Sequence, residues 1–116
     1  MNTILLQEKI DSLLNSVRLL LPDGSNMGYV YSDDLALLNN RIHDQIDELY
    51  SQRGETVEQE AALCLAILMG YSVSMYADPE DESQRQNILY RSQRLLDNIP
   101  SFSLRQQLSE ICHELV

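Results

Sequence analysis

The sequence has no tryptophan, two cysteines, three prolines, four glycines and only eight basic residues against 18 acidic ones. The formal net charge of −10 argues against binding to nucleic acid or to anionic membrane surfaces, because both need positive charge on the protein. The four glycines are isolated, which excludes a glycine-rich phosphate loop. Cys64 and Cys112 lie in apolar helical patterns, so we interpret them as buried thiols in a reducing compartment.

The chain opens with MNTILLQEKIDSLL, which lacks the basic region, the long apolar stretch and the cleavage site of a signal peptide. We therefore expect a cytoplasmic protein. A length of 116 residues is typical of one domain, and it is enough to bury a core without disulfides or a metal.

Apolar residues recur at helical spacing along most of the chain, and proline and glycine mark the breaks. The pattern predicts helices over residues 3–21, from Ser32 to just before Gly54, over about 57–77, and from Pro79 to just before Pro100. A short fifth helix is expected to begin near Ser101 or Ser103, and residues 23–31 are expected to form a loop. The predicted fold is all-α: a single domain over 1–116, built as a compact bundle of four to five helices around the central helix 57–77.

The central helix carries an uncharged run of 17 residues from Ala61 to Ala77. Small residues recur there at every fourth position, which predicts close approach of a neighbouring helix: Ala62, Ala66, Gly70 and Ser74. A helix that is apolar on all sides is typically buried on several sides. A membrane span is the alternative, but the run is short for a bilayer and has no basic residue beside it. Thr56 and Gln59 are predicted to form a capping box at the start of this helix.

Residues that could carry chemistry are few. His43, Asp44 and Asp47 could supply part of a metal site, but a third ligand at suitable spacing is missing. Cys112 and His113 are sequence neighbours, so on a helix they point about 100° apart and cannot form a catalytic pair. We therefore predict no catalytic, metal or cofactor-binding residues and a protein that is not an enzyme.

The acidic residues are concentrated in one part of the chain. Between Asp33 and Glu82 there are twelve acids and two arginines, whereas the remaining residues carry six acids and six bases. Matching of helix dipoles and a solvated face account for part of this charge. The functional interpretation is an acidic surface that binds a basic partner. The candidate contact residues, chosen because they are not expected to cap or pack, are Asp44, Asp47, Glu48, Glu80 and Glu82.

Three stretches resemble one known family: YSDDLALLN, ELYSQRGETVEQEAALCLAILMGYSVSMY and RSQRLLDNIPSFSLRQQL. This pattern is similar to the UpxZ family of Bacteroides over about Tyr31 to Leu108, and its most specific block runs from Glu58 to Tyr76. The resemblance implies an antagonist of transcription antiterminators. It also implies a partner, the UpxY proteins, which are NusG-like elongation factors encoded in capsular polysaccharide loci. UpxZ is thought to block the UpxY proteins of other loci, so that one capsule operon dominates.

Two other functions remain open from the sequence. A helical adaptor or chaperone would bind an amphipathic partner helix, and this needs an exposed apolar groove and little salt dependence. A small helical DNA-binding regulator is disfavoured because no helix is basic. Residue patterns leave open the target, the contact surface and the oligomeric state.

Overall fold

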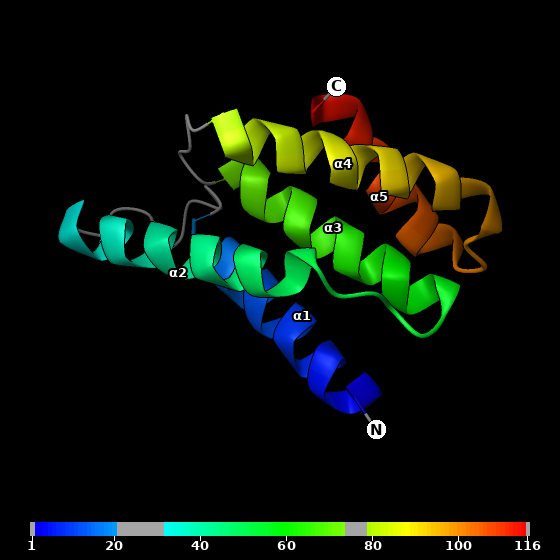
Figure 1. Cartoon of the computed structure of the whole chain (residues 1–116), viewed down its shortest axis with the longest axis horizontal. Helices are drawn as coiled ribbons and strands as arrows, with labels where there is room; N and C mark the ends of the chain where they lie inside the picture. The colour runs from blue at the N-terminus through cyan, green and yellow to red at the C-terminus, as the bar shows by residue number, and fades with distance from the viewer. Residues whose placement is uncertain (1, 21–31, 74–78, 116) are drawn as a thin grey trace.

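Helices make up nearly all of the computed structural model, which describes residues 2–20, 32–73 and 79–115 (Figure 1). The elements are α1 (Asn2–Leu20), α2 (Ser32–Tyr50), α3 (Val57–Val73), α4 (Pro79–Leu95), the 3-10 turn η2 (Leu96–Asn98) and α5 (Phe102–Leu115). Within those ranges there is no strand, so the predicted all-α class is confirmed. The expected loop 23–31 and the end of the central helix beyond Val73 lie outside the described residues.

Helix α3 occupies the centre of the bundle, as the sequence predicts. It packs against α1, α2, α4 and α5, and Figure 1 shows it running between α2 and α4. Six consecutive residues, Leu63 to Leu68, are all buried, which requires that neighbouring helices pack on several sides of α3. No described helix is both long enough and apolar enough to span a membrane.

The other helices each bury one stripe against α3. The buried residues of α1 and α2 follow a spacing of three or four, as an amphipathic helix requires: Leu6, Ile10, Leu13 and Val17 on α1, and Ile42, Ile46 and Leu49 on α2. Helices α4 and α5 contribute a second set to the same hydrophobic cluster: Ile88, Leu89, Leu108, Ile111 and Cys112.

Gly70 lies where α3 packs tightly against α2. A Cβ atom built on Gly70 would lie 2.8 Å from Cδ1 of Ile46 and 3.4 Å from Cγ2 of Ile42. Glycine therefore lets α2 lie closer to α3 than any other residue would. The predicted close packing along the small-residue stripe is observed at this position, whereas Ser74 lies outside the described residues.

The connection between α2 and α3 folds back onto the first turn of α3. The backbone N–H of Gln59 donates to Oγ1 of Thr56 at 3.0 Å, which confirms Thr56 as the cap. The second half of the predicted capping box differs, because Oε1 of Gln59 accepts from the N–H of Glu55 at 3.0 Å. The chain bends at Glu55 and Thr56, and the bend brings this earlier N–H over the helix end.

The end of α4 departs from the prediction of a continuous helix up to Pro100. The α-helix ends at Leu95 and continues as the 3-10 turn η2. A residue that precedes proline avoids the helical region, and Ile99 is extended, with φ −79° and ψ 118°. Ser101 then caps α5, since its Oγ accepts from the N–H of Leu104 at 3.3 Å.

Candidate functional site

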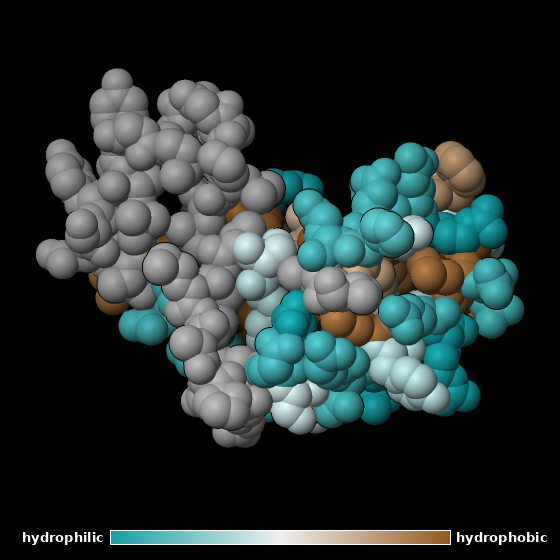
Figure 2. Space-filling view, turned by 90° about the horizontal axis from the view of Figure 1, so that it is seen from above, coloured by the Kyte–Doolittle hydropathy of each residue, from teal (hydrophilic) through white to brown (hydrophobic). Residues whose placement is uncertain are grey.

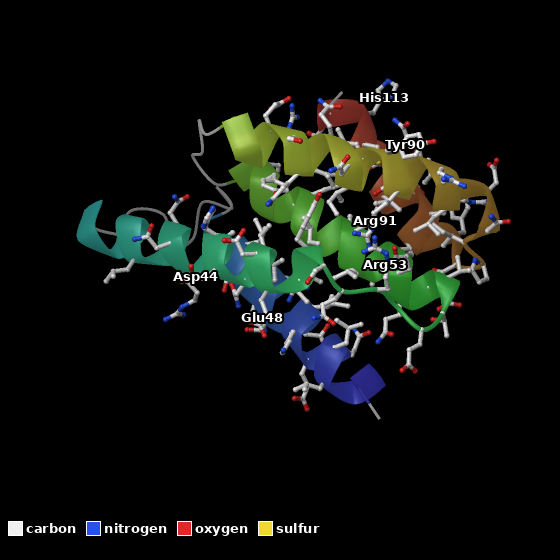
Figure 3. All side chains as sticks on the ribbon, viewed as in Figure 1. Asp44, Glu48, Arg53, Tyr90, Arg91 and His113 are labelled. Atoms are coloured by element: carbon white, nitrogen blue, oxygen red, sulfur yellow. The ribbon has the colours of Figure 1, made fainter. Side chains whose placement is uncertain are left out.

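Three of the five candidate acids lie on the exposed surface of α2. Asp44, Asp47 and Glu48 occupy neighbouring positions on one side of the helix, because residues three and four apart face the same way. Figure 3 shows Asp44 and Glu48 on the side of α2 that is turned away from α4. We refer to Asp44, Asp47 and Glu48 as the α2 acidic face.

The acids of this face are only loosely paired. Asp47 lies 3.4 Å from Nδ1 of His43, and the Asp47 side chain is 50% exposed. Glu48 forms an ion pair with Lys9 of α1 while it remains about half exposed. Asp44 makes no ion pair with any described residue. Exposed pairs of this kind contribute little to stability, so these carboxylates remain accessible to a partner.

The other two candidates belong to the start of α4. The side chain of Glu80 lies outside the described residues, whereas Glu82 is exposed. A hydrogen bond from Arg85 is the main cause that holds the pKa of Glu82 below its usual value, and a hydrogen bond from Gln86 adds to this effect. Figure 3 shows Asp44 and Glu48 on the side of α2 turned away from α4, so the α2 candidates and Glu82 on α4 lie in two separate regions.

Glu60 belongs to the same acidic segment, but its carboxylate points into the structure. Its Oε2 lies 2.7 Å from Nη2 of Arg91 on α4, and its Oε1 accepts from the N–H of Gly54 at 2.8 Å. The Glu60 side chain is 15% exposed, so this acid holds the fold together and does not form part of an accessible surface. The sequence gives no local signal for this pair, because 31 positions separate the two residues.

A groove lies between α1, α3 and α5 on a side of the bundle that the sequence interpretation did not single out. Its volume is about 310 Å³. The floor and inner walls are apolar, and the outer edges are polar or charged; the lining residues are Leu14, Arg18, Leu65, Met69, Gln107, Glu110, Ile111 and Glu114. One feature of the sequence could have indicated this groove: α3 carries more apolar residues than one neighbouring helix could cover.

Two exposed aromatic residues accompany arginines near the α4–α5 connection. The guanidinium of Arg94 lies 5.6 Å from the centre of the Tyr90 ring, and that of Arg105 lies 5.9 Å from the Phe102 ring. Figure 2, which looks onto the α4 side, shows apolar side chains among hydrophilic ones on the described part of this face. Each arginine shields the face of one ring.

The side chains considered for chemistry do not converge. Among the residues that the structure describes, no group of three potential ligands could hold a metal ion. Cys112 is buried and His113 is exposed, so the two side chains enter different environments. Burial raises the pKa of the Cys64 thiol to about 11, which keeps it protonated at neutral pH.

Comparison with known proteins agrees with this all-helical fold. The model of the UpxZ family of transcription anti-terminator antagonists matches residues 10–114. The crystal structure of a transcription anti-terminator antagonist UpxZ from Bacteroides uniformis is 28% identical and superposes with a TM-score of 0.75, covering 95% of this chain and 74% of that one. None of the curated proteins is a significant match. The resemblance carried by residues 31–108 is confirmed, and the chain belongs to the UpxZ family of transcription anti-terminator antagonists.

Proposed function

We propose that this transcription regulator binds NusG-like antiterminators of the UpxY type directly and blocks them without catalysis. Its targets would be the antiterminators of other capsular polysaccharide loci, and it would act in the cytoplasm, where transcription takes place. Membership of a family of anti-terminator antagonists is the observation that carries this proposal. Antagonism by direct binding requires an accessible surface and no active site.

The α2 acidic face is the surface that we assign to the first encounter with the antiterminator. NusG-like domains contact polymerase and nucleic acid, so a basic patch on the target would complement Asp44, Asp47 and Glu48. Charges at the rim of an interface act mainly on the rate of association and on its salt dependence. Glu80 and Glu82 at the start of α4 would form a second, separate acidic contact.

A binding titration against a panel of UpxY proteins at low and high salt tests this function. The reversal Asp44→Lys/Asp47→Lys changes two exposed carboxylates, so we expect an unchanged melting temperature. We expect association at low salt to slow by about tenfold or more, with a weaker dependence on salt. Charge reversal of the internal Glu60 is not a suitable variant, because it would perturb folding.

The possible results separate the function from its mechanism. If no UpxY protein binds at micromolar concentration, the proposed function is wrong. If a UpxY protein binds but neither salt nor the reversal of Asp44 and Asp47 changes the association rate, direct antagonism stands and the role of the α2 acidic face is wrong.

A further inference from the structure

The groove between α1, α3 and α5 leaves part of the hydrophobic core open to the surface. Leu65 and Ile111 at its floor are nearly buried, whereas Leu14 and Met69 are only half-buried. Both α1 and α5 pack on α3, but they separate enough to leave this space between them. Apolar side chains that stay partly exposed in a concave site are typical of a binding surface.

The two edges of the groove carry opposite charges. Glu110 and Glu114 lie one turn apart on α5, and Arg18 lies on α1. Arg18 donates to the amide oxygen of Asn15, at 3.3 Å, and Glu110 accepts from the amide of Gln106, at 3.2 Å. Within the described part of the chain, none of these three charged groups forms an ion pair. The charges are therefore free to pair with a ligand.

The lining favours a helix over a small molecule as the ligand. Its two buried members, Leu65 and Ile111, are apolar, so no buried polar group points inward to orient a small molecule. Leu65 and Met69 lie four residues apart on α3, so they form an apolar strip along one side of that helix, on which the apolar face of a partner helix can pack. Methionine adapts its shape to different apolar partners, which suits Met69 to such a surface.

We propose that this groove binds an amphipathic helix of a partner protein. Apolar side chains of that helix enter between α1 and α5, and its lysines or arginines lie along Glu110 and Glu114. An acidic residue on its opposite flank would face Arg18. The groove is distinct from the α2 acidic face. Its proposed role in helix binding holds whichever protein supplies the helix.

Methionine-methyl NMR provides a direct test, because Met69 lies in the groove. The probes are two synthetic helical peptides with the same leucine stripe, one flanked by lysines and the other by glutamates. The methyl signal is assigned with Met69→Leu, a volume-conserving substitution that the fold should tolerate. We expect the lysine peptide to shift the Met69 signal in a saturable way, and the glutamate peptide to bind at least tenfold more weakly.

A matched pair of variants locates the charge contribution. Glu110→Lys/Glu114→Lys and Asp44→Lys/Asp47→Lys make the same change in net charge at exposed positions on different helices. We expect the α5 variant to weaken binding of the lysine peptide at least tenfold, and the α2 variant to weaken it less than threefold. Thermal melts establish that both variants are folded.

Three results would overturn this proposal. They are an unshifted Met69 signal at millimolar lysine peptide, equal binding of the two peptides, and equal loss of affinity in the two variants. No antiterminator is present in this experiment, so its outcome is independent of the UpxY titration.

Discussion

Arg91 on α4 closes the carboxyl end of α2 and at the same time pairs with Glu60 on α3. Its Nη1 donates to the carbonyl of Tyr50, and its Nη2 donates to the carbonyl of Gln52, both at 3.3 Å. Its Nε and Nη2 lie 3.2 Å and 2.7 Å from Oε2 of Glu60. Helix α2 has no basic residue in its own last turn, so a residue from another helix satisfies these carbonyls.

Substitution of Arg91 should destabilise the fold far more than loss of an ordinary surface arginine. Arg91→Met removes every one of these bonds and leaves the largely buried Glu60 carboxylate without its cation. We expect the free energy of unfolding to fall by about 2 to 3 kcal/mol. Urea denaturation of the variant measures this loss.

The control for Arg91 lies one turn away on the same helix. Arg94 is exposed and stacks on the Tyr90 ring, so Arg94→Met should cost less than about 1 kcal/mol. In the double variant Arg91→Met/Glu60→Gln the unpaired charge is gone, and part of the stability should return. Equal losses for Arg91→Met and Arg94→Met would contradict the proposed role of Arg91.

The packing of Gly70 against α2 can be tested with a pair of core variants. Gly70→Leu places a side chain where even a Cβ would lie 2.8 Å from Cδ1 of Ile46, so we expect a loss of about 1 to 3 kcal/mol. Ile46→Val removes that Cδ1 atom. In the Ile46→Val background, Gly70→Ala should therefore cost less than in the parent, because the 2.8 Å contact is gone and the next one, with Cγ1 of residue 46, is at 3.2 Å. A higher melting temperature for Gly70→Leu would show that α2 does not pack closely there.

Gly54 should tolerate alanine less well than Gly70. A Cβ on Gly54 would lie 2.2 Å from the backbone nitrogen of Glu60 and 2.7 Å from its Cα, and backbone atoms of a helix cannot move aside as a side-chain tip can. We expect Gly54→Ala to lower the melting temperature more than Gly70→Ala does. Thermal melts of the two variants in one buffer decide the order, and the reverse order would contradict the described α2–α3 connection.

The Cys64 thiol should make stability fall at alkaline pH. Burial raises its pKa from about 9 to about 11, with the Arg91 guanidinium acting in the opposite direction. A raised thiol pKa stabilises the folded state below pH 9, and this contribution is lost as the pH rises towards 11. The free energy of unfolding of the parent should fall more steeply than that of Cys64→Ala, by about 1.4 kcal/mol per pH unit in this window.

Cys112 provides the comparison for this pH dependence. Burial also raises the pKa of its thiol, but the side chain is slightly more exposed than that of Cys64. Cys112→Ala should therefore remove a smaller part of the alkaline dependence. Parallel stability curves for the parent and Cys64→Ala between pH 9 and pH 11 would contradict the assignment.

Features that depend on local spacing could be predicted from the sequence. The recurrence of Ile42, Ile46 and Leu49 defines the buried stripe of α2, because side chains three or four apart share one face of any helix. The central place of α3 was also predictable, since a helix without a polar face has no side to turn towards water.

Features made by residues from different helices could not be predicted in the same way. Glu60 was grouped with the acidic segment, and only the fold reveals that Arg91 holds it inside. Likewise the acids of α2 and α4 belong to one acidic segment of the sequence but lie in separate regions, because the α2 acids project from the side of α2 that is turned away from α4. The groove needs three helices at once, so no single stretch of sequence encodes it.

The enclosure of α3 by four other helices has a consequence for hydrogen exchange. Each neighbouring helix covers a part of α3 that would otherwise be exposed to solvent, so detaching any one of them exposes core residues. The backbone amides of Leu63 to Leu68 should therefore exchange with solvent only when the whole bundle opens. Their exchange rates would report the global free energy of unfolding, while amides on the outer helices would report local fraying.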